Sequence, residues 1–162
     1  MPSINLPAAG HAGPVVPGGH AYQPFANAGF VRLVQDAFAI ITPRITGHAP
    51  CNAAFRALPN GRTFAALWVD PAIWINFDPR NVSGDFGATS GNDITITAFS
   101  LGMGKWTVAA TLVHEMAHVN GAPGNTHAAE GTLRSCLLAD HENPAIIGTR
   151  LDPVLRIRTA AA

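Results

Sequence analysis

The hydrophobic and polar positions of residues 28–41 follow the spacing of an amphipathic helix. Arg32, Gln35 and Asp36 fall outside the apolar side of the helical wheel, and Pro43 ends the run. The apolar positions are Phe30, Leu33, Val34, Ala37, Phe38 and Ile41. The pattern predicts a helix that backs a sheet. A second short helix is expected over residues 51–58, where the sequence PNG stops it.

Three stretches in the middle of the chain are typical of β-strands. TFAALWV (63–69) and AIWINF (72–77) are short apolar runs separated by Asp70 and Pro71. Residues 78–93 are dense in Gly, Asn, Asp and Ser, which predicts turns. DITITAF (93–99) alternates apolar with other side chains and gives the strongest strand signal in the chain. We therefore expect a small twisted sheet.

A second amphipathic helix is predicted over residues 106–120. Its apolar stripe consists of Val108, Leu112, Met116 and Val119. Gly121 is placed to end this helix, and Thr126 is placed to cap a further helix that runs to residue 138. Together the elements predict an α+β fold: a small sheet, a backing helix, the 106–120 helix and a helix after it.

The first 27 residues differ in composition from the rest. They are rich in Pro, Gly and Ala, and we predict a flexible arm without regular structure over residues 1–27 and a folded domain over residues 28–162. Two roles are considered for the arm. It is a tether, or it is an inhibitory pro-segment that folds His11 or His20 over a site.

Composition narrows the function classes. The chain has 162 residues, of which 48% are hydrophobic and 12% are charged, with a net charge of +0. This composition predicts one folded core and no basic surface for nucleic acid. No apolar run is long enough to span a bilayer, and the N-terminus has no pattern of a Sec signal. A cytoplasmic start is expected, with export by a signal-less route or excision from a longer polypeptide left open.

The two cysteines, Cys51 and Cys136, form one disulfide or remain two buried thiols, and the sequence does not discriminate between these states. Thiolates also bind zinc, so Cys136 is a candidate ligand. If the last predicted helix begins at His127, Cys136 lies too far along it to reach the same metal. This favours a core thiol that faces Leu133 and Leu137.

Three of the seven histidines and two of the three glutamates lie between residues 114 and 130. His114 and His118 are four residues apart, so they share one face of the predicted helix, away from its apolar stripe. An i, i+4 imidazole pair can bind one Zn²⁺ without bending the helix. Glu115 projects beside such a metal, where a carboxylate can accept a proton from water. The string HEMAH matches the HExxH pattern in full.

A catalytic zinc needs a third protein ligand and one position left for water. His127 follows the turn at Gly121, and we expect it to be this ligand. Glu130 is the alternative, either as the ligand itself or as a carboxylate that orients an imidazole. Asp140, His141 and Glu142 are further candidates downstream.

The HEMAH segment resembles the zincin metallopeptidases. Its loop spacing is similar to the deuterolysin and lysine-specific (aspzincin) branch, where HExxH is followed by G-x-x-D-x-x-Y-G and the Asp is the third ligand. Here the segment GNTHAAEG, residues 124–131, has His127 at the Asp position and Glu130 at the Tyr position. The resemblance implies a compact zincin-like fold with one catalytic Zn²⁺.

The implied function is peptide-bond hydrolysis by metal-activated water, with Glu115 as general base and a protein or peptide as substrate. Since the only tyrosine, Tyr22, lies in the arm, His141 and Arg134 are the candidates for stabilising the oxyanion. The strand at 93–100 is either an edge on which an extended peptide docks or an ordinary central strand.

Two alternatives to the endopeptidase are kept. One is a zinc amidase that acts on cell-wall peptide. The other is a zinc-binding accessory or interaction domain without turnover, in which Glu115 only makes a hydrogen bond. Size and leader composition also suggest an effector or toxin module delivered by a bacterial secretion system. The oligomeric state is left open.

Overall fold

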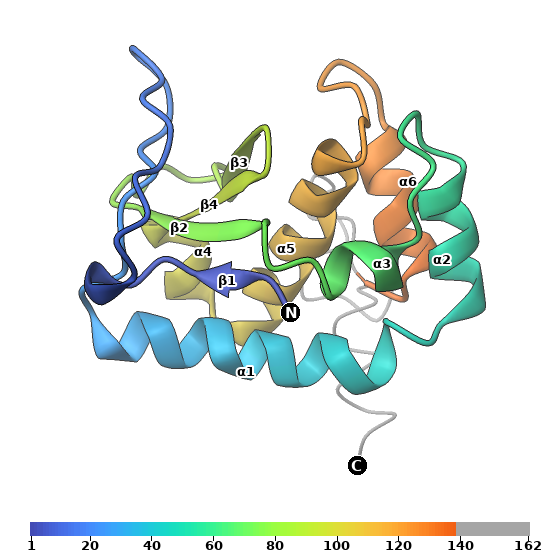
Figure 1. The fold of residues 1–162 in the computed structure, drawn as a ribbon, viewed down its shortest axis with the longest axis horizontal. Helices are drawn as coiled ribbons and strands as arrows, with labels where there is room; N and C mark the ends of the chain where they lie inside the picture. The colour runs from blue at the N-terminus through green and yellow to red at the C-terminus, as the bar shows by residue number, and fades with distance from the viewer. Residues whose placement is uncertain (139–162) are drawn as a thin grey trace.

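A four-stranded mixed sheet and six α-helices make up residues 1–138, the part of the chain that the computed structural model describes (Figure 1). The elements in chain order are β1 (Ser3–Ile4), a 3₁₀ turn η1 (Pro7–Ala9), α1 (Ala28–Arg44), α2 (Ala49–Arg56), α3 (Phe64–Trp68), β2 (Trp74–Asp78), β3 (Gly87–Ser90), β4 (Asp93–Thr97), α4 (Ala98–Met103), α5 (Lys105–Val119) and α6 (Ala128–Ser135). The predicted α+β class is confirmed.

The strand order in the sheet is β1-β2-β4-β3. β2 runs parallel to β1 and to β4, whereas β3 is antiparallel to β4. The strand predicted from DITITAF is confirmed as β4, and of the two alternatives considered for it, the central strand is correct and the edge is wrong. β1 and β3 are the two edge strands, and β3 comes from the stretch in which only turns were predicted.

β4 ends two residues earlier than the alternation suggested. The hydroxyl of Thr97 accepts a hydrogen bond from the backbone N–H of Ser100 at 3.2 Å and caps α4. A capping side chain satisfies an N–H that the first turn of a helix leaves without a partner. The local cap therefore starts a helix at Ala98, where the apolar pattern alone continued the strand.

The run TFAALWV is the clearest error in the predicted elements, because it forms α3 rather than a strand. The hydroxyl of Thr63 accepts from the N–H of Ala66 at 3.1 Å, which caps the helix. Phe64, Leu67 and Trp68 are then buried on one side at i, i+3 and i+4 spacing. A five-residue apolar run fits a buried strand and a buried helical turn equally well, and the cap decides between them.

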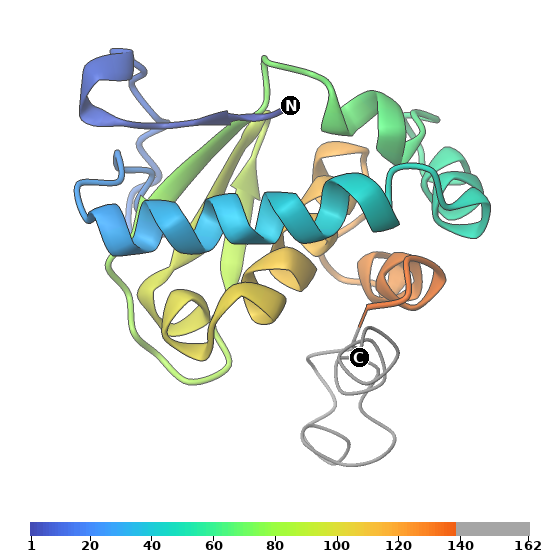
Figure 2. The same ribbon diagram turned by 90° about the horizontal axis from the view of Figure 1, so that it is seen from below.

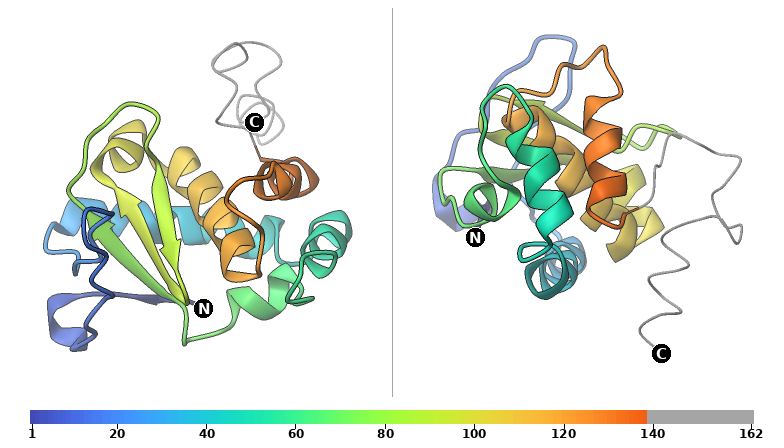
Figure 3. Two further views of the ribbon diagram at one scale, coloured as in Figure 1. Left: turned by 90° about the horizontal axis from the view of Figure 1, so that it is seen from above. Right: turned by 90° about the vertical axis from the view of Figure 1, so that its right-hand side faces the viewer.

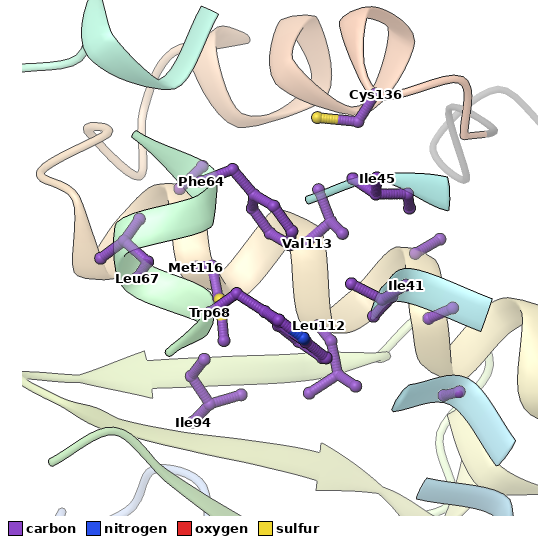
Figure 4. Packing of buried hydrophobic residues seen from close by; sticks show 14 of the residues in the cluster. Ile41, Ile45, Phe64, Leu67, Trp68, Ile94, Leu112, Val113, Met116 and Cys136 are labelled. Carbon is purple, nitrogen blue, oxygen red and sulfur yellow. The ribbon is translucent and has the colours of Figure 1, made fainter. Parts of the chain in front are cut away.

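α1 and α5 pack against each other on one face of the sheet, and both contribute buried side chains to the core (Figures 2 and 4). The predicted helix at 28–41 is confirmed, although α1 continues through Pro43 to Arg44. A proline in the last turn removes only one backbone hydrogen bond, and the N–H of Ile45 still bonds to the carbonyl of Ile41 at 2.9 Å. The predicted apolar stripe of α5 is buried along its whole length.

α6 is confirmed, with bounds that differ from those expected. His127, not Thr126, occupies its N-cap position, and the helix ends at Ser135 because Leu137 takes a left-handed conformation (φ 64°). A disulfide joins Cys136 at the end of α6 to Cys51 in α2, so neither cysteine is a free thiol. The Cα atoms of the pair are 4.4 Å apart and both residues are buried.

The segment before α1 covers the face of the sheet opposite α5 (Figure 3), where an arm without regular structure was predicted. β1 pairs with β2. His11 Nε2 lies 2.6 Å from a carboxylate oxygen of Asp93, and His20 Nδ1 lies 2.8 Å from Asp78. The Pro- and Gly-rich composition predicted a loop. It did not show that polar side chains of β2 and β4 form hydrogen bonds with this segment.

Within residues 1–138, no helix is long and apolar enough to cross a membrane.

Candidate active site

α5 presents two imidazoles on one face, one helical turn apart. The Nε2 atoms of His114 and His118 lie 3.1 Å from each other, and the rings meet at 67°. Two nitrogens bound to one tetrahedral zinc at about 2.0–2.1 Å each are separated by about 3.3 Å. The 3.1 Å separation is therefore close to that of two nitrogens on one cation, and it is also the distance of a hydrogen bond between the two rings.

The backbone after α5 fixes the tautomer of His118. Nδ1 of its ring lies 2.8 Å from the carbonyl oxygen of Ala122, and because a carbonyl can only accept, Nδ1 carries the proton. The lone pair of the neutral ring is then on Nε2, the nitrogen that faces His114. Gly121, with φ 89°, turns the chain back so that Ala122 reaches this position.

Glu115 is buried between α5 and the edge of the sheet, with an exposed fraction of 4%. The hydroxyl of Thr89 on β3 donates to its carboxylate oxygen Oε2 at 2.8 Å. Burial raises the pKa of Glu115 to about 6, while the Thr89 hydrogen bond and the neighbouring His118 act to lower it. A carboxyl group with a pKa near neutrality is suited to accept and return a proton.

Two hollows meet at His114 and Glu115. A groove of about 680 Å³ runs between β3 and the face of α5 that carries both histidines, and its lining also includes Asn60, Asn92 and Gly124. A smaller cavity of about 120 Å³ is lined by His114, Glu115 and Glu130 together with Asp85, Phe86 and Leu133. His114 and Glu115 line both spaces and therefore stand at the junction between them.

Gly87 allows β3 to lie this close to α5. A Cβ atom at this position would be 2.6 Å from the carbonyl oxygen of Thr95 and 2.8 Å from Cγ2 of Thr111. Any larger residue would push the edge strand away from the helix that carries Glu115. Gly87 and Thr89 were not identified from the sequence, because β3 lies in a stretch whose composition indicates turns.

Glu130, rather than His127, lies next to the histidine pair. The side chain of Glu130 is 7% exposed, and its Oε1 is 3.9 Å from Nδ1 of His114. The side chain of His127 is 91% exposed, and its Nδ1 is 4.0 Å from Oε2 of Glu130. Oε2 of Glu130 is buried without a hydrogen-bond partner in the described residues. A buried carboxylate oxygen without a partner lowers the stability of the folded state unless a cation lies beside it.

Several predicted site residues are not brought to the pair. Among residues 1–138, no three His, Cys, Asp or Glu side chains already converge as a set that could hold a metal ion. Arg134, a candidate for stabilising the oxyanion, is exposed on α6. Asp140, His141 and Glu142 lie outside the described residues, and with them the second oxyanion candidate.

Tyr22 is buried, but it lines neither hollow. Burial, followed by the carboxylates of Glu115, Asp93 and Asp78, raises the pKa of its phenol to about 12. His11 and His20 bond to carboxylates on the other face of the sheet, so the structure does not place either imidazole over the His114–His118 pair.

The facing imidazoles of His114 and His118 offer two nitrogen donors of the kind that zinc prefers, and the carboxylates of Glu115 and Glu130 lie beside them without completing a converged metal site in the described residues. The fixed tautomer of His118 adds the hydrogen bond that metal-binding histidines usually make through their other nitrogen. Comparisons with models of protein families, with curated proteins and with solved structures find no match to this chain.

Proposed function

We propose that this chain is a zinc-dependent endopeptidase with a zincin-like fold, in which His114 and His118 bind the metal. One observation carries the proposal: the two Nε2 atoms face each other at 3.1 Å while Nδ1 of His118 is held by a backbone carbonyl. A helix that carried two histidines by chance would not need to present matching nitrogens with the tautomer already fixed.

The other residues of the site have roles that follow from their positions. When bound, Zn²⁺ supplies a Lewis acid that polarises an amide carbonyl and makes water more acidic. Glu115 accepts the proton of the attacking water and returns it to the leaving amine, and its burial keeps the carboxyl group apart from bulk solvent. β3, the edge strand along the groove, offers its outer edge to an extended peptide.

The proposal is tested by zinc uptake and by zinc-dependent cleavage. We expect the purified chain to bind one equivalent of zinc by metal analysis and to cleave casein, with cleavage stopped by a chelator and restored by added zinc. His118→Ala should lose both properties, because one of two converging nitrogens is removed. His48→Ala is the matched control, since His48 lies at the start of α2 and should keep wild-type zinc content.

Each other outcome has a distinct meaning. Failure of the wild type to take up zinc, or undiminished uptake by His118→Ala, would overturn the metal site. Stoichiometric zinc without cleavage of casein or a mixed peptide pool would support the accessory zinc-binding domain. Cleavage restricted to cell-wall peptides would support the amidase.

Glu130 is expected to contribute to zinc affinity more than His127 does. Glu130→Gln keeps the size of the side chain but removes the charge beside His114, so the zinc dissociation constant should rise roughly 10- to 100-fold. His127→Ala removes a side chain that is 91% exposed and should leave the constant unchanged. Competition titration with a zinc-binding dye measures both variants. The reverse order of effects would restore His127 as the third ligand.

A further inference from the structure

The approach of β3 to α5 creates a contact that the chemistry above does not explain. Side chains alternate between the two faces of a strand, so Gly87 and Thr89 point to the same side. Gly87 leaves no room for a Cβ atom between β3 and Thr111 on α5. The strand therefore lies near enough to the helix for Thr89, two residues further along, to reach Glu115.

Thr89 contacts Glu115 through one hydroxyl group. Its Oγ1 lies 2.8 Å from the carboxylate oxygen Oε2 and 3.1 Å from the backbone carbonyl oxygen of the same residue. A hydroxyl has one proton to donate, and the shorter contact to a charged oxygen is the stronger of the two. Because Glu115 is only 4% exposed, this hydrogen bond is shielded from competing water.

We propose that Thr89 is a positioning residue, whose hydroxyl holds the Glu115 carboxylate in the orientation needed for proton transfer. The proposal rests on the proposed function, in which Glu115 is the general base. A glutamate side chain has three rotatable bonds, and the β-branched Thr89 on a paired strand is a stiff donor that restricts them. Small errors in the placement of a catalytic group reduce the rate strongly.

A purely structural role for the same contact makes different predictions. If Thr89 only attached β3 to α5, removing its hydroxyl would lower the melting temperature, or would raise KM because the strand beside the groove shifts. A positioning role instead lowers kcat while KM, zinc affinity and melting temperature stay near their wild-type values. Thr89→Val and Thr89→Ser separate these roles, since valine keeps the branched shape and serine keeps the hydroxyl.

The experiment compares both variants with wild type as zinc-loaded full-length chains. Using a quenched fluorescent peptide taken from a casein cleavage site, we expect Thr89→Val to lower kcat by about 10- to 100-fold. Thr89→Ser should stay within about threefold of wild type. Thr95→Val is the matched control, because it removes a buried hydroxyl bond to the carbonyl of Ala21 on the other face of the sheet and should keep wild-type kcat.

A second measurement does not depend on activity. A crystal structure of Thr89→Val should show the Glu115 carboxylate rotated or in two orientations. A crystal structure of Thr89→Ser should show it in its wild-type position. An unchanged kcat in Thr89→Val, a loss that serine does not rescue, or a carboxylate that stays in place would each overturn the positioning role. If the wild type cleaves nothing, the proposed function fails, and the carboxylate orientation alone decides whether Thr89 positions Glu115.

Discussion

Replacing Glu115 by glutamine is expected to lower kcat for peptide cleavage by about 10²- to 10⁴-fold and to leave zinc content unchanged. The amide has nearly the same shape and its oxygen can still accept the hydrogen bond from Thr89, but it cannot take a proton from water. Since the side chain is buried between α5 and β3, an isosteric change should disturb the packing little. Steady-state kinetics with the casein-derived peptide and metal analysis of the same sample measure the two effects.

The control for this variant is Gln35→Glu, which exchanges the same two residue types in the reverse direction on the outer face of α1. This control should keep wild-type kcat. Full activity of Glu115→Gln would remove Glu115 from the role of base. A loss of zinc together with activity would show that the variant disrupts the metal site, and the loss of rate would then say nothing about proton transfer.

The central part of the site could be predicted from the sequence because it depends on helix geometry alone. Residues four apart on an α-helix share a face, so the pairing of His114 with His118 follows once the 106–120 segment is known to be helical. The position of Glu130 relative to His127 could not be predicted in this way. It depends on where α6 docks against α5, which is set by packing and by the disulfide to α2.

The fold could be predicted where the period is clear, as in the long helical patterns of α1 and α5 and the strict alternation of β4. It was mispredicted where a single side chain decides a short element, as the hydroxyl of Thr63 does for α3. β3 was not predicted because its glycine, Gly87, is required by the close approach of the strand to α5. A contact between segments distant in sequence leaves no local pattern. The segment before α1 was mispredicted for a related reason: its partners, such as Asp93 for His11, are distant in sequence.

Reduction of the Cys51–Cys136 disulfide is expected to destabilise the chain strongly. The two cysteines are 85 residues apart in the sequence. In the chain-entropy model, closing a loop of this length stabilises the folded state by about 4–5 kcal/mol. For a domain of this size, losing that contribution lowers the melting temperature by roughly 10–15 °C. Both residues are buried, so the bond should resist mild reductants in the folded protein and break once unfolding exposes it.

The same bond fastens the end of α6, the helix that carries Glu130, to α2. Thermal unfolding of oxidised wild type, of fully reduced wild type and of the double variant Cys51→Ser and Cys136→Ser measures the effect, with zinc affinity determined on each sample. We expect the reduced and double-variant proteins to melt alike and to bind zinc more weakly than the oxidised protein, because α6 is no longer held beside His114.

Equal melting temperatures for oxidised and reduced protein, with free thiols verified in the latter, would show that core packing alone fixes α6.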